Sequence, residues 1–172
     1  MNSIATQLKQ KFESSIHIDS LGQDVLYFSK EDYLDAVQYL KSECEITMCI
    51  DVTAVDFLGC NDRKAIEGVQ LERFEIVSNF ISHKRNERVR LIVEIEENHP
   101  TVASICSVFP GANFAEREVF DMFGIEFEGH PDMTRILMPD EWQGHPLRKD
   151  DSPARIPVNF TDDISSAEES FQ

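Results

Sequence analysis

Two Gly-His-Pro tripeptides, at residues 129–131 and 144–146, contain the first candidates for chemistry in this sequence, His130 and His145. Acidic residues close enough along the chain to join them as metal ligands are Asp132, Asp140 and Glu141. A hydrolytic metal site needs three or four converging ligands, yet the sequence has no H-E-x-x-H motif and no closely spaced histidine pair. We therefore interpret the tripeptides as chain corners, and keep a small metal-dependent hydrolase using His130 and His145 as an alternative.

Three carboxylates with an arginine among them form a second candidate: Glu116, Arg117, Glu118 and Asp121. Paired carboxylates beside an arginine can act as general acid and base. Acids near the start of a helix also stabilise it, and Arg117 and Asp121 have the spacing of an ion pair on one helix. We interpret the group as cap and interface residues. The sequence contains no nucleophile elbow and no glycine-rich phosphate loop.

The four cysteines, at positions 44, 49, 60 and 106, could in principle bind an iron-sulfur cluster. Cys44 and Cys49 have the first spacing of a plant-type ferredoxin, but the third ligand would fall at Val52, and no C-x-x-C occurs. We expect reduced thiols, buried or half-buried, in a reducing compartment.

The composition predicts one domain with an appendage, because the chain has 172 residues of which 41% are hydrophobic. It has 16 basic and 32 acidic residues, a formal charge of -16, which disfavours binding to nucleic acid or to an anionic membrane surface. The first residues, MNSIATQLKQKFESS, contain no apolar h-region, and no window approaches the ~18 consecutive apolar residues of a spanning helix. We expect a soluble cytoplasmic chain without membrane insertion, whose partners offer neutral or basic surfaces.

The pattern of apolar residues predicts an α+β fold, a two-layer domain with helices on one face of a mostly antiparallel sheet. Ser29 has the type and position of a helix cap, as does Asn113 with Glu116 three residues later, and Gly124 can end that helix. The predicted helices cover 3–12, 29–43, 100–109 and 113–124. The predicted strands cover 24–29, 45–57, 68–82 and 88–96, with a short last strand after residue 124.

An arm at residues 128–160 is predicted to follow the globular domain, residues 1–127, and to precede an acidic tail at 161–172 that we expect to be disordered. Five of the seven prolines fall in the arm, so no helix or central strand of normal length fits there. It nevertheless carries Met133, Ile136, Leu137, Met138, Trp142, Leu147, Ile156, Val158 and Phe160. Because an irregular segment cannot bury such side chains within itself, we expect it to lie across its own domain or a partner.

The stretch EREVFDMFGIEFEGHPDMTRILMPDEWQGHPLRKD closely resembles the signature of the 30 kDa, or C, subunit of proton-pumping NADH:quinone oxidoreductase, respiratory complex I. DVTAVDFLG and RFEIVSNFISHKRNERVRL are similar to the central strand and hairpin of that family. The resemblance covers about residues 45 to 155 and is spread over several segments. It is therefore more specific than any single short motif.

The resemblance implies a non-catalytic subunit in the peripheral arm of a hetero-oligomer, on the cytoplasmic face of the inner membrane. It implies that FMN and the iron-sulfur clusters are held by other subunits, and that this chain binds no cofactor or metal. The expected partners are chiefly the 49 kDa (D) subunit, and also B and I. Because the sequence ends at residue 172, we expect D to be a separate polypeptide, clamped by the arm.

The residues that match the motif are expected to bind partners. They are Glu116, Arg117, Glu118, Asp121, Phe123, Gly124, Gly129, His130, Pro131, Arg135, Ile136, Leu137, Pro139, Trp142, Gly144, His145, Pro146, Leu147, Arg148, Lys149 and Asp150. The sequence departs from the motif at Phe114, Thr134, Glu141 and Asp151, and Thr134 removes a basic residue that could pair with a partner. The homologous subunit of a membrane-bound hydrogenase, or of a ferredoxin- or NAD(P)H-fed dehydrogenase, is the alternative within the same class of complexes.

Overall fold

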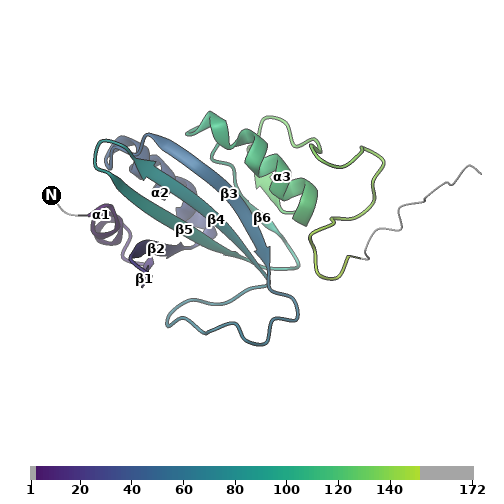
Figure 1. Ribbon diagram of the computed structural model, residues 1–172, viewed down its shortest axis with the longest axis horizontal. Coiled ribbons are helices and arrows are strands. Elements are labelled where there is room, and N and C mark those ends of the chain that lie inside the picture. The colour runs from purple at the N-terminus through teal and green to yellow at the C-terminus, as the bar shows by residue number, and fades with distance from the viewer. Residues whose placement is uncertain (1–2, 152–172) are drawn as a thin grey trace, which may run out of the picture.

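A five-stranded sheet organises residues 3–151, the part of the chain that this computed structural model describes (Figure 1). Across the sheet the order is β1 (Ile16–Ser20), β2 (Gln23–Phe28), β5 (Glu87–Ile95), β4 (Phe74–Ser82) and β3 (Met48–Asp56). Neighbouring strands are antiparallel except β2 and β5, which run parallel. The predicted α+β class with a mostly antiparallel sheet is confirmed.

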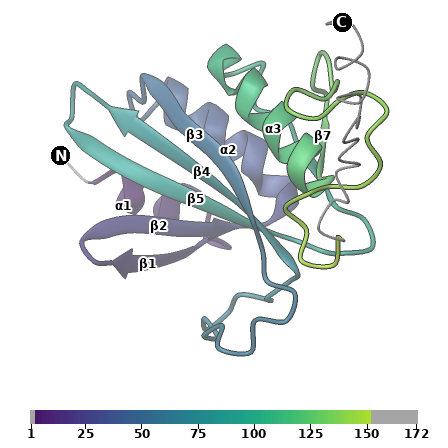
Figure 2. The ribbon, with the colours of Figure 1, turned by 45° about the vertical axis from the view of Figure 1, so that its right-hand side comes forward.

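Helices α1 (Ile4–Lys11), α2 (Lys30–Ser42) and α3 (Asn113–Phe123) pack their apolar sides into one core with the sheet. Figure 2 shows α2 behind the sheet and α3 beside β3. The predicted cap of α2 is confirmed, because the Ser29 hydroxyl accepts a hydrogen bond from the Asp32 N–H. Among the described residues, no helix is both long and apolar enough to span a bilayer.

The opposite face of the sheet is only half covered. The loop between β3 and β4 places Ile66 and Val69 against Val25, Tyr27 and Ile92. In the same loop Arg63 lies between two carboxylates, those of Glu75 and Glu94, at 2.5 Å from each. These two acids oppose each other on β4 and β5, so the arginine relieves a cross-strand repulsion.

Two of the predicted elements differ from the structure, and one strand was missed. Residues 101–103 form strand β6 (Thr101–Ala103) instead of the predicted helix over 100–109, because this segment pairs in parallel with β7 (Glu126–Glu128). Strand β1 was not predicted. The strand predicted from residue 68 begins at Phe74, since the residues before it belong to the loop.

Candidate functional site

The described part of the arm, residues 129–151, folds back along α3 without forming a helix or strand of its own (Figure 1). Gly129 and Gly144, the first residues of the two Gly-His-Pro tripeptides, have φ angles of 82° and 92°, so both are the predicted corners. A Cβ atom on Gly144 would also lie 2.6 Å from the Asp151 carboxylate. The predicted arm residues 152–160, with Ile156, Val158 and Phe160, and the tail lie outside the described residues.

The buried carboxylate of Asp121, in the second half of α3, holds the middle of the arm. Its Oδ2 accepts hydrogen bonds from three consecutive backbone N–H groups, those of residues 136, 137 and 138, at 3.0, 2.7 and 2.9 Å. Its Oδ1 accepts from Arg135 Nη1 at 2.7 Å. Burial alone would raise the pKa of Asp121, but these donors outweigh it and hold the pKa below its ordinary value. The prediction that Asp121 pairs with Arg117 is therefore wrong.

Arg117 instead donates to the arm. Its Nε and Nη2 bond the carbonyl oxygens of Thr134 and Arg135, and Nη2 also bonds the Thr134 hydroxyl. Thr134, where the motif usually has a basic residue, thus accepts hydrogen bonds from its own chain. Arg117 and Asp121 hold consecutive parts of the arm from neighbouring positions on the helix.

The second Gly-His-Pro corner packs on the end of α3. His145 Nδ1 lies 3.0 Å from the Asp121 carbonyl oxygen, and the Leu147 N–H donates to the Met122 carbonyl. Arg148 donates to the carbonyl oxygens of Phe123 and Gly124. A Cβ on Gly124, where φ is 69°, would lie 2.5 Å from the His145 ring, so only glycine allows this close approach. The carbonyl groups left unpaired at a helix end are satisfied here by the arm.

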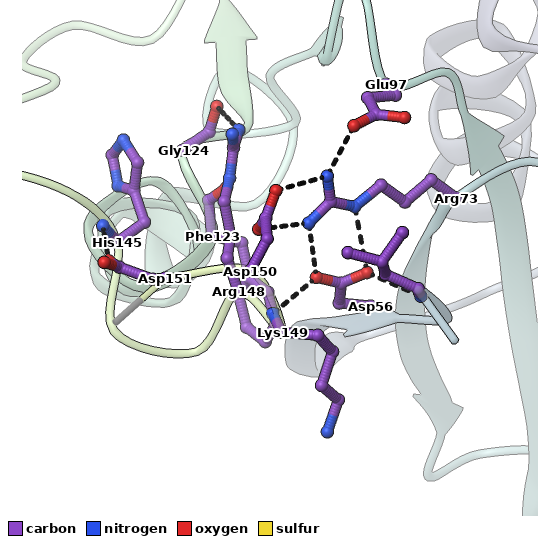
Figure 3. A network of polar contacts seen from close by, with 11 residues as sticks. Asp56, Arg73, Glu97, Phe123, Gly124, His145, Arg148, Lys149, Asp150 and Asp151 are labelled. Carbon is purple, nitrogen blue, oxygen red and sulfur yellow. Dashed lines mark hydrogen bonds and ion pairs between the residues drawn. The ribbon is translucent and has the colours of Figure 1, made fainter. Parts of the chain in front are cut away.

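The last described residues are fastened to the sheet by the network in Figure 3. Arg73 bonds both Asp56, at 2.9 Å, and Asp150, at 2.5 Å, while Glu97 lies 2.6 Å from its other amino group. The Lys149 N–H also donates to Asp56. Burial would raise the pKa of Asp56, but the hydrogen bonds from Arg73, Lys149 and Leu58 bring it down to about 2. Lys149 and Asp150 are thus linked to the sheet through two residues, Asp56 and Arg73, that were not predicted.

Glu116 is fully buried, so the expectation that it caps the start of α3 is wrong. No side-chain cap is formed at Asn113 either, because a 3-10 turn, Pro110–Ala112, leads directly into the helix. The Glu116 carboxylate accepts hydrogen bonds from the Ser104 hydroxyl at 2.6 Å, the Ile105 N–H at 2.8 Å and the Cys106 thiol at 3.2 Å. It therefore ties α3 to the segment that follows β6.

The side chains of Cys106, Glu116 and His130 place ligand-type atoms within 4.8 Å of one another. The Asp132 N–H, however, donates to His130 Nδ1 at 3.0 Å, which leaves the proton on Nε2, the nitrogen that faces Glu116 at 4.0 Å. A metal on Nε2 would need that proton on Nδ1, where a donor already points. Burial raises the pKa of Cys106 to about 11, which also disfavours a thiolate ligand. The arrangement of these three side chains therefore fits a set of structural hydrogen bonds better than a metal site.

His130 and His145 lie at opposite ends of α3. His130 Nε2 is 3.3 Å from the carbonyl oxygen of Asn113, whereas His145 contacts that of Asp121. Eight residues of helix, roughly 12 Å, separate these two contacts. The two histidines therefore do not form the joint site of the hydrolase alternative. The four cysteines are free thiols, of which Cys60 is exposed, contrary to the expectation.

The remaining motif residues divide by exposure. Phe123 is buried in the core and Trp142 is half-buried. The indole Nε1 of Trp142 is buried and has no hydrogen-bond partner among the described residues. Besides Gly129, Gly144, Lys149 and Asp150, the exposed motif residues are Glu118, Pro131, Ile136, Leu137, Pro139, Pro146 and Leu147.

Large apolar side chains at the surface of the described residues form two groups, apart from Leu21. The first lies on α3 and the arm and consists of Phe114, Ile136, Leu137 and Leu147. The second lies on β3 and the turn after it and consists of Met48, Ile50, Val55 and Leu58. Since folding normally covers contiguous apolar surface, both groups are candidates for contact with another protein.

Comparison with protein families gives a match to residues 26–155 for the family described as "Respiratory-chain NADH dehydrogenase, 30 Kd subunit". The C subunit of the NADH-quinone oxidoreductase of Trichlorobacter lovleyi is 41% identical over 151 residues, which cover 87% of this chain and 88% of that protein. The family match therefore includes most of the sheet, α3 and the whole described arm.

A second relative, the C/D subunit of the NADH-quinone oxidoreductase of Methylococcus capsulatus, is 40% identical over 154 residues. The match covers 86% of this chain but only 26% of that longer protein. Among solved structures, the trypsin-resistant fragment of Nqo5 is similar with a TM-score of 0.66 and 25% identity, over 76% of this chain and 99% of the fragment.

Proposed function

This chain belongs to the family of the 30 kDa subunit of the respiratory-chain NADH dehydrogenase, and we propose that it serves an NADH-quinone oxidoreductase as a non-catalytic subunit of the peripheral arm. In that role it braces the subunits that carry the cofactors, so that electrons pass from NADH to quinone over fixed distances. It takes no part in the chemistry itself.

The observation that carries this proposal is the fixed surface that the arm makes on α3. The arm's backbone is bonded to Arg117, to Asp121 and to the carbonyl groups at the helix end, so its shape at these contacts is set before any partner binds. Leu137 and Leu147 are nevertheless 59% and 50% exposed. A surface that is ordered in advance loses less conformational entropy on binding and therefore binds more tightly.

The partner that we propose for this surface is the D subunit. In the fused relative, the C and D portions belong to one polypeptide, which keeps them together in a fixed ratio. B and I are proposed as further neighbours in the same complex.

Trp142 supports a partner at this place. An indole N–H that is buried without an acceptor costs about 1 to 3 kcal/mol, so this turn of the arm is not at its most stable in the isolated chain. A neighbouring polypeptide that reshapes the turn can supply the missing acceptor. Aromatic residues with one polar atom are also frequent anchors in protein interfaces.

We propose that the chain binds no flavin, iron-sulfur cluster, quinone or metal of its own. The hydrogen bonds of the Cys106, Glu116 and His130 cluster account for these three residues without an ion. FMN and the iron-sulfur clusters then belong to other subunits, and the chain lies peripherally at the cytoplasmic face of the inner membrane.

The expected result of replacing both exposed leucines, Leu137→Asp and Leu147→Asp, is loss of the chain from the oxidoreductase while the chain itself stays folded. Both side chains face solvent, so the charge costs the isolated domain little, whereas a carboxylate in an apolar interface loses several kcal/mol of binding. The measurement is native-gel separation of solubilised membranes, stained for NADH oxidation and probed for this polypeptide.

Leu21→Asp is the matched control, because Leu21 is fully exposed in the β1–β2 turn, away from α3 and the arm. The control variant should migrate with the NADH-oxidising band. If the double variant also migrates with that band, the proposed interface is wrong. If the unaltered chain never migrates with that band but with a hydrogenase or a ferredoxin-fed dehydrogenase, the alternative complex is correct.

A further inference from the structure

The half of the sheet that the β3–β4 loop leaves uncovered has an unusual mixture of side chains. Figures 1 and 2 show that no helix between residues 3 and 151 crosses the front of β3, β4 and β5. Met48 and Ile50 of β3 are 47% and 42% exposed there. A sheet face that met only water would carry polar residues at its outward positions.

Two arginines of β5, Arg88 and Arg90, lie beside these apolar residues on the same face. Arg88 opposes Ile81 on β4 and Arg90 opposes Asn79, and Asn79 in turn opposes Asp51 on β3. Alternate residues of a strand share a face, so both guanidinium groups project from the uncovered side. They line a shallow hollow of ≈ 260 Å³ together with Ile50, Asn79 and Asp51.

These arginines differ from the others in the described part of the chain. The other arginines between residues 3 and 151 bond carboxylates or backbone carbonyl groups, as Arg63, Arg73 and Arg117 do. Arg88 has no hydrogen-bond or ion-pair partner there, and the one hydrogen bond of Arg90 goes to the Asn79 side chain at 3.0 Å. In a chain with 32 acidic residues, two arginines without a carboxylate partner are conspicuous.

We propose that this face, defined by Met48, Ile50, Arg88 and Arg90, is a second docking surface, and that it binds an acidic segment of another subunit. The proposal rests on the proposed function, since it needs the chain to be part of a complex. Two arginines facing the single carboxylate of Asp51 leave an excess of positive charge in the hollow, which a carboxylate of the partner would balance. The apolar residues around it favour a polypeptide over a small anion.

This partner differs from the one that the net charge suggests. A formal charge of -16 favours neutral or basic partners for the molecule as a whole. The uncovered face favours an acidic one, because local charge decides contacts at short range while distant charges are screened within about 10 Å. The face on β3 to β5 and the surface on α3 therefore select different neighbours.

The test uses the intact oxidoreductase with a photoreactive benzoylphenylalanine at Ile50, in the hollow. We expect a cross-link to an Asp- or Glu-containing peptide of another subunit, identified by mass spectrometry. Gln38, exposed on α2, is the negative control position, and Leu147 is the control for the arm. Arg88→Glu should reduce the yield at Ile50 by about tenfold or more. Lys11→Glu, the same charge change at an exposed position of α1, should leave it unaltered.

Three outcomes would overturn the inference: no cross-link from Ile50, a cross-link to a second copy of this chain or to lipid, or a yield that Arg88→Glu does not change. If Leu147 still cross-links to a neighbouring subunit in any of these cases, the proposed function stands and only the second surface fails. If neither position cross-links and the chain is absent from the complex, the proposed function fails as well.

Discussion

Asp121→Asn is expected to release the arm from α3 while leaving the sheet and its helices folded. The asparagine has nearly the same size, but its amide nitrogen would face donors, either the three backbone N–H groups of residues 136–138 or Arg135. Breaking a buried charged pair in this way costs about 3 to 5 kcal/mol. That is more than the remaining contacts of an irregular segment are expected to compensate.

Trp142, the one tryptophan of the chain, reports on the arm directly. We expect its fluorescence to shift to longer wavelength in Asp121→Asn and trypsin to cut faster within the arm. Glu118→Gln is the control, since Glu118 is exposed on the same helix. The account of the arm is wrong if Asp121→Asn has the same emission and the same proteolysis rate as the unaltered chain.

The pH dependence of the arm follows from the same carboxylate. The pKa of Asp121 is held below its ordinary value in the folded chain, so its contribution is fully present above the unfolded pKa of about 3.9. The contribution is lost as the pH falls through the lower, folded pKa. The Trp142 signal should therefore stay constant from pH 8 to 5 and change only below about pH 4, whereas Asp121→Asn should show the released signal throughout.

Arg73→Met is expected to give the largest loss of global stability, about 3 to 5 kcal/mol of unfolding free energy at pH 7. The side chain of Asp56 is fully buried, and this change removes the cation that balances it (Figure 3). Urea denaturation followed by circular dichroism measures the effect. The loss should be smaller near pH 4, where the unpaired Asp56, no longer held at a pKa of about 2, can take up a proton.

Two further variants test whether the stability loss in Arg73→Met comes from the buried, unbalanced charge of Asp56. Lys84→Met removes an ion pair with Glu45 in which the lysine side chain is 73% exposed. This change should therefore lower the free energy of unfolding by less than about 1 kcal/mol. Arg73→Met combined with Asp56→Leu should recover much of the stability, because no unpaired charge remains. If Arg73→Met is no more harmful than Lys84→Met, the network of Figure 3 does not fasten the arm.

Cap residues and the alternation of apolar and polar residues predicted the helices and strands that depend on neighbouring residues in the sequence. Ser29 identified the start of α2, and alternation along 88–96 identified β5 within one residue at each end. The helix predicted at 100–109 failed because the strand there depends on pairing with β7, about 25 residues further along. Short strands of three residues carry too little periodicity to be recognised before their partner is known.

Glu116 and Asp121 are buried acceptors of hydrogen bonds, and these roles could not be predicted because acidic side chains are usually exposed to solvent. One signal was available for Glu116, which lies three and seven residues before Val119 and Phe123 and so on the buried stripe of α3. Nothing local distinguishes Asp121, because its donors come from the arm, 14 to 17 residues later. Asp56 and Arg73 lie farther still from the motif and meet Asp150 only in the folded chain.

Of the two places expected for the apolar residues of the arm, its own domain or a partner, the described part of the arm uses the first. Its backbone is satisfied on its own domain, so the arm is not left without a surface when the chain is alone. Met133 and Met138 pack against the core, while Leu137 and Leu147 stay exposed. The arm that the resemblance implies as a clamp on D is therefore an ordered surface on α3 in the chain alone.

The central claim, that a partner polypeptide covers the surface formed by α3 and the arm, is tested most directly by hydroxyl-radical footprinting of the chain alone and in the intact oxidoreductase. Oxidation of Phe114, Leu137 and Leu147 should fall several-fold in the complex, while Leu21 should be oxidised equally in both. Equal oxidation of all four side chains in the two samples would contradict the account, because a surface that binds a partner cannot remain as open to solvent as before.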